Sequence, residues 1–222
     1  MAWEYAKNGY QVFCFNFDAG DHGGYEAVRV KHENITYVNA WIDDSFDPVA
    51  DGYPVPDIIF AFPPCTDMAV SGARHFAAKA AKDPLFQVKA VNTARVAAKL
   101  GDKCGCPYMI ENPVSVLSSK WRKADYSFHP YEYGGYLPED DVHPFFPEYI
   151  NARDSYPKKT CLWTGNGFNM PPSKPVPVAK GYSEQHKKLG GKSAKTKLIR
   201  SLTPRGFAAG VFSANDFRRV VE

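Results

Sequence analysis

The sequence predicts an α/β fold with a mostly parallel sheet, and three observations support this. First, short apolar runs rich in β-branched and aromatic residues recur at residues 11–17, 35–41, 57–62 and 107–110, as is typical of buried strands. Second, residues 74–100 contain many helix formers, and strands that alternate with helices form βαβ units. Third, a chain of 222 residues with 44% hydrophobic content can bury a full core.

The remaining segments complete the order of elements. Residues 1–8 have the composition of a helix end that Gly9 closes, and the helical region at 74–100 is interrupted near Asp83-Pro84. From residue 121 to about 177 the pattern dissolves into Pro, Gly, Tyr and His, which indicates an irregular recognition insertion outside the sheet. Residues 201–215 close the chain with a helix. We therefore expect a main domain of residues 1–120 and 198–222, and an insertion of residues 121–197.

The predicted strand at 57–62 runs directly into Pro63-Pro64-Cys65. Proline fixes φ and has no N–H, so the two prolines end the sheet ladder and hold Cys65 on a stiff turn. Open α/β sheets bind ligands at the carboxyl ends of their strands, so a thiol presented there is a candidate nucleophile. The other interpretation is a buried structural cysteine, because an unpaired Cys is among the most buried residue types. These residues alone leave both interpretations open.

Acidic residues also follow predicted strands, namely Asp18, Asp43 or Asp44, and Glu111. An acid after the second strand of a Rossmann-like sheet is placed to bind ribose hydroxyls, and an acid after the next strand can accept a hydrogen bond from an adenine amino group. We expect Glu111 to lie near the crevice, where a partly desolvated carboxyl group can have a raised pKa and donate a proton. The other interpretation is a set of turn acids that bind nearby backbone amides.

The net charge of +3 hides a strong asymmetry. Residues 158–219 contain thirteen Lys or Arg but only two acids, Glu184 and Asp216, whereas the rest of the chain has a net charge of −8. A segregated basic segment is typical of a protein that binds a phosphate backbone, and it favours a DNA partner. A solvated basic surface without a partner is the other interpretation.

The cysteines and the hydropathy of the sequence indicate the cellular compartment of the protein. The five cysteines are an odd number without the spacing of a disulfide framework, so we expect reduced thiols and a cytoplasmic location. No apolar run is long enough to span a membrane and no signal peptide is found, so no membrane partner is predicted. The Cys104-Gly105-Cys106 spacing is too tight for the usual zinc knuckle, and no metal site is predicted.

Two motifs carry a resemblance to a known family. The loop from Pro64 to Gly72, with Cys65 and a Ser71-Gly72 pair, resembles the Pro-Cys loop of C5-cytosine DNA methyltransferases, in which a Ser-Gly pair follows the cysteine at this spacing. Glu111-Asn112-Pro113 resembles the Glu-Asn-Val motif of that family and comes in the same order. The sequence is also similar to small phage-type DNA cytosine methyltransferases in stretches that span most of the chain, namely 63–66, 71–74, 111–114, 158–163 and 203–208.

This resemblance implies a class I methyltransferase-like (Rossmann-like) fold that methylates C5 of cytosine in DNA with S-adenosylmethionine. The thiolate of Cys65 would add to C6 of the base, and Glu111 would supply a proton or hydrogen bond at N3. The cytosine would be single-stranded or flipped out of the duplex. A phage origin, with a bacterial cytoplasm as location, follows from the same likeness.

The resemblance also assigns further site residues. Asp18, Asp43 and Pro63 are expected to contact S-adenosylmethionine. Residues 66–76 are expected to form a mobile loop that closes over the base, with Gly72 as its hinge. The remaining predicted contacts to substrate or DNA come from this loop, from the Glu-Asn-Pro motif and from the start of the basic segment, and they are Ser71, Gly72, Arg74, Asn112, Lys158, Lys159 and Thr160.

Two family features are not found in the sequence. The opening strand and Gly-rich cofactor loop of the family are not found before residues 3–8, so we expect either an N-terminally shortened form or an incomplete cofactor site. No Gln-x-Arg-x-Arg pattern occurs, and Lys158-Lys159-Thr160 is expected to substitute for it. The missing glycine loop supports an alternative, a catalytically inactive DNA-binding protein that keeps the fold. The short insertion supports another, an enzyme that modifies a free cytidine nucleotide.

Overall fold

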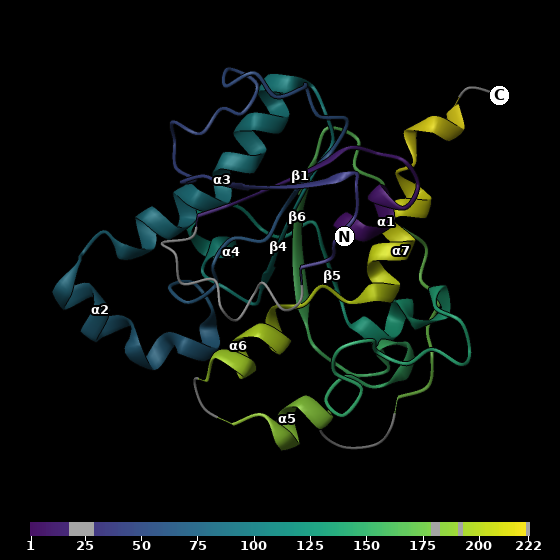
Figure 1. Cartoon of the computed structure of the whole chain (residues 1–222). Helices are drawn as coiled ribbons and strands as arrows, with labels where there is room; N and C mark the ends of the chain where they lie inside the picture. The colour runs from purple at the N-terminus through teal and green to yellow at the C-terminus, as the bar shows by residue number, and fades with distance from the viewer. Residues whose placement is uncertain (18–28, 179–182, 191–192, 221–222) are drawn as a thin grey trace. The chain divides into compact units, whose positions relative to one another are not determined.

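The computed structural model describes residues 1–222 except 18–28, 179–182, 191–192 and 221–222 (Figure 1). The chain has a mixed α/β fold whose sheets contain parallel strand pairs. It forms two compact units. The terminal unit contains Met1–Ala40, His129–Lys158 and Asn169–Glu222, and the central unit contains Trp41–Phe128 and Lys159–Phe168.

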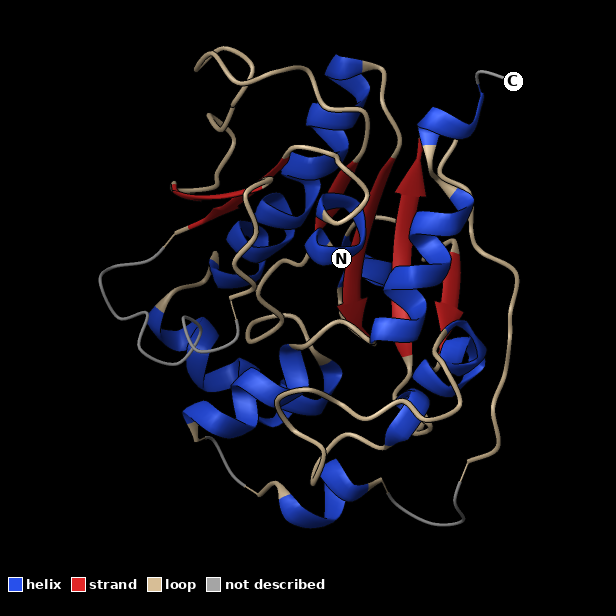
Figure 2. Cartoon of the chain, turned by 45° about the vertical axis from the view of Figure 1, so that its right-hand side comes forward, coloured by secondary structure: helices blue, strands red, loops and turns tan. Residues whose placement is uncertain are grey.

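The central unit is built on a four-stranded sheet in the order β3-β4-β6-β5 (strands red in Figure 2). Strands β3 (Ile59–Ala61) and β4 (Tyr108–Pro113) are parallel. Strand β6 (Thr160–Gly165) runs antiparallel to β4 and to β5 (Tyr126–Phe128). The three-residue length of β3 follows from Pro63 and Pro64, which cannot extend the ladder.

Helix α3 (Phe86–Cys104) packs on this sheet. Its apolar face recurs at helical spacing in Val91, Ala94 and Ala98, and these side chains form one core with Ile110 and Trp163 of the sheet. Gly105 ends the helix with φ +66°, in the left-handed region that favours glycine at this position. Three shorter helices complete the central unit, namely η3 (Val70–His75), α2 (Phe76–Lys82) and α4 (Leu117–Lys120).

The terminal unit contains a parallel pair of strands, β1 (Val12–Asn16) and β2 (Ile35–Asn39). Helix α1 (Ala2–Ala6) packs against α7 (Arg205–Ala214), where the rings of Tyr5 and Phe212 meet edge to face. The remaining elements of this unit are η4 (Pro130–Tyr136), η5 (Ala152–Asp154), α5 (Glu184–Lys188), α6 (Ala194–Ser201) and η6 (Phe217–Val220).

Most of the elements expected from the sequence are confirmed. An observed strand lies at each of the four predicted positions, and β4 extends beyond its predicted end at residue 110. The expected interruption near Asp83-Pro84 separates α2 from α3, and the expected closing helix is α7.

Two expectations about the sheet are wrong. Residues 121–177 were expected outside the sheet, but they supply β5 and β6. Because β6 is antiparallel to both of its neighbours, the sheet is mixed rather than mostly parallel. The side chains from Thr160 to Trp163 are all buried, so this strand shows no alternation of polar and apolar residues by which it could be predicted.

Candidate functional site

Cys65 lies at the surface on a tight turn that follows β3. Its side chain is exposed, so it is not a buried structural cysteine. Its carbonyl oxygen accepts hydrogen bonds from the backbone N–H groups of Met68 (3.0 Å) and Ala69 (2.8 Å). Met68 is completely buried and belongs to the core beneath α3. The turn is therefore anchored three residues after the thiol.

Asn112 joins this turn to β4. Its Nδ2 donates a hydrogen bond to the carbonyl oxygen of Pro63 at 3.0 Å. The Asn112 side chain is 1% exposed, and its Oδ1 has no hydrogen-bond partner among the described residues. The sequence predicted Asn112 as a substrate or DNA contact, whereas in this structure its amide is buried against the backbone of the Cys65 turn.

Glu111 is half-buried within β4, opposite Leu162 of β6. The strand was expected to end at residue 110, but pairing with β6 extends β4 to Pro113 and places Glu111 in the ladder. Burial raises the pKa of the neighbouring Cys161 thiol; the positive charge of Lys159 lowers it, and the negative charge of Glu111 adds to the rise. Glu111 thus lies within the parallel neighbour of β3, and the turn with Cys65 follows β3.

The segment after Cys65 is largely helical. Residues 66–76 were expected to form a loop, but residues 70–75 form η3, which contains the predicted contacts Ser71, Gly72 and Arg74. Ser71 and Arg74 are exposed, and neither η3 nor α2 has a buried residue. Lys79 of α2 donates hydrogen bonds to the Thr66 carbonyl (2.9 Å) and to the Asp67 carboxylate (2.5 Å). Whether Gly72 acts as a hinge stays a prediction.

A second part of the candidate site lies where residues 41–47 run along α3. A cavity of about 250 Å³ opens beside Trp41 and Asp43, and its wall on α3 is formed by Lys89, Asn92 and Thr93. The Trp41 side chain is 63% exposed. An aromatic surface next to a carboxylate, an amide and a hydroxyl can hold a flat, polar heterocycle by stacking and hydrogen bonding.

The Asp43 carboxylate is also part of a local turn. It accepts hydrogen bonds from the backbone N–H (2.8 Å) and the hydroxyl (2.6 Å) of Ser45. These bonds hold the pKa of Asp43 below its usual value, so the group is ionised at neutral pH. Asp43 thus binds a nearby backbone amide, as the second interpretation of the strand-end acids expected. A ligand would have to share the Asp43 carboxylate with Ser45. Asp18, the other predicted cofactor contact, lies outside the described residues.

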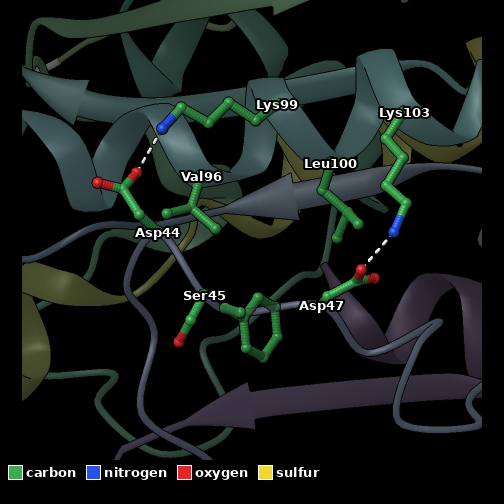
Figure 3. Close-up of a pocket in the computed structure, with 8 residues that line it drawn as sticks. Asp44, Ser45, Asp47, Val96, Lys99, Leu100 and Lys103 are labelled. Carbon is green, nitrogen blue, oxygen red and sulfur yellow. Dashed lines mark hydrogen bonds and ion pairs between the residues drawn. The ribbon is translucent and has the colours of Figure 1, made fainter.

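Two ion pairs hold the same segment on α3. Lys99 pairs with Asp44 and Lys103 pairs with Asp47, across a second cavity of about 210 Å³ (Figure 3). Val96 and Leu100 of α3 lie between the two pairs (Figure 3), and Phe46 also lines this cavity. The two lysines lie four residues apart, so both face one side of the helix. We call these two ion pairs the clamp of residues 41–47 on α3. The spacing of Lys99 and Lys103 is the sequence feature from which it could have been predicted.

The boundary between the two units falls within the predicted contacts at the start of the basic segment. Lys158 belongs to the terminal unit, where its Nζ donates a hydrogen bond to the Arg200 carbonyl at 2.7 Å. Lys159 and Thr160 belong to the central unit, where Thr160 begins β6 and is 1% exposed. The buried hydroxyl of Thr160 does not lie at the surface, as a contact to DNA would require.

Comparisons with known proteins return no relative: no protein-family model matches the sequence, and no curated protein or solved structure is similar to it. Within the ranges that the structure describes, no helix is long and apolar enough to cross a membrane, and no three His, Cys, Asp or Glu side chains cluster as metal ligands.

Proposed function

We propose that this protein transfers a methyl group from S-adenosylmethionine to C5 of cytosine in DNA, on a class I methyltransferase-like fold. The observation that carries the proposal is that β3, which leads into the turn of the exposed Cys65, is the parallel neighbour of β4, which contains Glu111. The bond from Asn112 to Pro63 joins β4 to this turn. A nucleophile and a proton donor are the two groups that addition to a cytosine ring requires.

In the proposed reaction, the Cys65 thiolate forms a bond to C6 of cytosine while Glu111 donates a proton or hydrogen bond at N3. The electron pair of the C5–C6 double bond moves onto C5, which becomes nucleophilic. S-adenosylmethionine supplies an electrophilic methyl group to C5. A base then removes the C5 proton, the double bond re-forms, and the thiolate leaves C6. Glu111 is half-buried in β4, and its carboxyl group is the acid that the proposed reaction assigns to N3.

The cavity beside Trp41 supports a site for part of the methyl donor. Its volume of about 250 Å³ lies below the usual range for a complete small-molecule site, roughly 300–1,000 Å³, so it fits the heterocycle rather than the whole molecule. Trp41 would stack on the adenine ring, and Asp43 would accept a hydrogen bond from its amino group. Thr93 and Asn92 offer further polar contacts from α3.

The charge of the basic segment supports DNA as the substrate. Residues 158–219 have a net charge of +11, and helix α6 alone contributes Lys195, Lys197 and Arg200 without an acid. A DNA backbone is neutralised by such a surface, whereas a free nucleotide needs few cations. Because the ring atoms of cytosine are inaccessible in a duplex, the base would be flipped out or already single-stranded.

The proposal is tested by the Cys65→Ala variant in an assay for transfer of labelled methyl groups to cytosine in DNA. We expect the variant to lose transfer, whereas Cys104→Ala, which removes a half-buried thiol elsewhere in the central unit, retains it. DNA that contains 5-fluorocytosine should trap wild-type protein as a covalent adduct at Cys65, because fluorine cannot leave C5 as a cation. Transfer that persists in Cys65→Ala would refute the mechanism, and transfer to dCMP but not to DNA would favour the nucleotide enzyme.

A second candidate function is DNA binding without catalysis. One observation favours it: the Asp43 carboxylate already accepts hydrogen bonds from Ser45, and the enzyme would need this carboxylate to bind the methyl donor. Titration calorimetry decides between the two functions: micromolar affinity for S-adenosylmethionine supports the enzyme, and DNA binding without affinity for the methyl donor supports the binding protein.

A further inference from the structure

The contact between β3 and β4 continues beyond the point where their backbones can pair. The parallel register runs from Ile59 opposite Tyr108 to Ala61 opposite Ile110. Two residues further on, Pro63 is level with Asn112. Proline has no N–H, so the backbone ladder ends here. The Asn112 side chain replaces it, because its Nδ2 donates to the Pro63 carbonyl oxygen at 3.0 Å.

The donor side of this hydrogen bond is buried, and its acceptor residue Pro63 is half-buried. The Asn112 side chain is 1% exposed, and its Oδ1 is buried without a partner among the described residues. Burying half of a carboxamide without a partner is unfavourable, so an apolar residue of similar size would be expected here if packing were the only requirement. The arrangement indicates that the Nδ2 bond to Pro63 has a specific role.

We infer that Asn112 is a positioning residue for Cys65. Its amide holds the Pro63 carbonyl, and the two prolines transmit that position to Cys65 with little freedom, because their φ angles are fixed. Met68 fixes the other side of the turn through its burial and its hydrogen bond to the Cys65 carbonyl. Since Asn112 directly follows Glu111 in β4, the bond sets the thiol relative to that carboxyl group. The catalytic consequence rests on the proposed function, whereas the positioning itself does not.

Two variants test this inference. Asn112→Ala removes the donor, and Asn112→Asp keeps the size of the side chain but replaces the donor by an acceptor. The first readout is the rate of Cys65 alkylation by iodoacetamide as a function of pH, followed by mass spectrometry of the peptide that contains Cys65. The second is the split between kcat and KM for methyl transfer to DNA. Asn166→Ala is the control for Asn112→Ala, because Asn166 Nδ2 also donates to a backbone carbonyl in the same unit, that of Cys106 at 3.2 Å. Asn166 Nδ2 donates to Asp102 Oδ1 as well, at 3.1 Å, so alanine is used rather than a second carboxylate.

We expect both Asn112 variants to shift the pH midpoint of Cys65 alkylation and to lower kcat by up to about 10²-fold, the cost of misplacing a reacting group, while KM changes little. Asn166→Ala should change neither. Unchanged alkylation profiles and kcat in both Asn112 variants would overturn the inference. A raised KM with unchanged alkylation would overturn it too, because Asn112 would then contact DNA directly.

The two proposals can fail separately. If wild-type protein transfers no methyl group, the proposed function fails, and the alkylation profiles still decide whether Asn112 positions Cys65. If Asn112→Ala does not fold, the isosteric Asn112→Asp variant decides, with circular dichroism to verify its fold.

Discussion

Arg205 holds both carboxylate oxygens of Asp141 in the terminal unit. Its Nη1 donates to Oδ1 at 2.8 Å and its Nη2 donates to Oδ2 at 2.6 Å, although 64 residues separate the two in the sequence. The Asp141 side chain is 6% exposed, and Oδ2 also accepts a hydrogen bond from the backbone N–H of Arg153 at 2.9 Å. This two-pronged pair connects the first turn of α7 to the loop before η5.

We therefore expect Arg205→Met to destabilise the protein by about 3 kcal/mol, because it leaves the Asp141 carboxylate buried without its cation. A buried carboxylate without its cation costs more stability than replacing the whole ion pair by apolar side chains. The double variant Arg205→Met/Asp141→Leu should therefore regain part of the lost stability. Urea unfolding of the single and double variants measures both effects. A double variant that is no more stable than Arg205→Met would contradict the explanation.

Two neighbouring groups give opposite dependences of stability on pH. Burial and the charge of Arg205 together lower the pKa of His143 to about 4, against the charge of Asp141, which raises it. The Nδ1 of His143 accepts hydrogen bonds from the backbone N–H groups of Phe145 and Phe146, which requires the neutral ring. Burial raises the pKa of Asp154 to about 6, against a hydrogen bond from the Gly206 N–H and the charge of Arg205.

The signs follow from linkage. The folded pKa of His143 lies below its unfolded value of 6.5, so its contribution to stability is present above pH 6.5 and is lost as the pH falls toward 4. The folded pKa of Asp154 lies above its unfolded value of 3.8, so the folded state gains stability as the pH falls from 6 to 3.8. Each change amounts to about 3 kcal/mol, and the two largely cancel.

Single variants should expose these opposing contributions. Relative to wild type, His143→Gln should become more stable as the pH falls from 6.5 to 4, and Asp154→Asn should become less stable as the pH falls from 6 to 3.8. Urea unfolding at a series of pH values measures the difference between each variant and wild type. Variants whose stability parallels that of wild type across this range would show that neither group titrates as described.

Gly206 is required by a close approach of backbones. A Cβ atom at this position would lie 2.4 Å from the carbonyl oxygen of Tyr133, which belongs to the backbone of η4 and cannot move aside alone. We expect Gly206→Ala to destabilise the protein by at least about 2 kcal/mol, as overpacking does. Gly190→Ala is the control, since a Cβ there meets no atom within 4 Å. Equal thermal stability of the two variants would contradict this account.

The clamp of residues 41–47 on α3 should depend on salt. The pairs of Lys99 with Asp44 and of Lys103 with Asp47 lie at the surface, so Lys99→Met/Lys103→Met should cost little stability. Under the proposed function, the variant should bind S-adenosylmethionine more weakly, and wild type should lose affinity as salt rises. Calorimetry measures the affinity of the variant and the salt dependence of wild type. Lys89→Met is the comparison, because Lys89 lines the cavity beside Trp41 but is not part of the clamp. Unchanged affinity and salt dependence in the double variant would contradict a role of the clamp in binding.

Local features of the sequence determined several elements of this protein. The β-branched runs predicted four strands, Asp83-Pro84 predicted the break between α2 and α3, and Pro63-Pro64 predicted the turn that exposes Cys65. These features act within a few residues through φ restriction, side-chain shape and hydrogen-bond capacity, so they can be interpreted without knowledge of the fold.

Only the tertiary structure decided the direction of β6, the inward orientation of Asn112 and the pairing of Arg205 with Asp141. Each joins residues that are dozens of positions apart, and the sequence does not indicate which of many possible partners will meet. A carboxamide after a strand can face DNA or a carbonyl group, and a buried strand has no alternation to reveal its neighbours. Long-range packing makes that choice, because burying a polar group is favourable only where the fold supplies its partner.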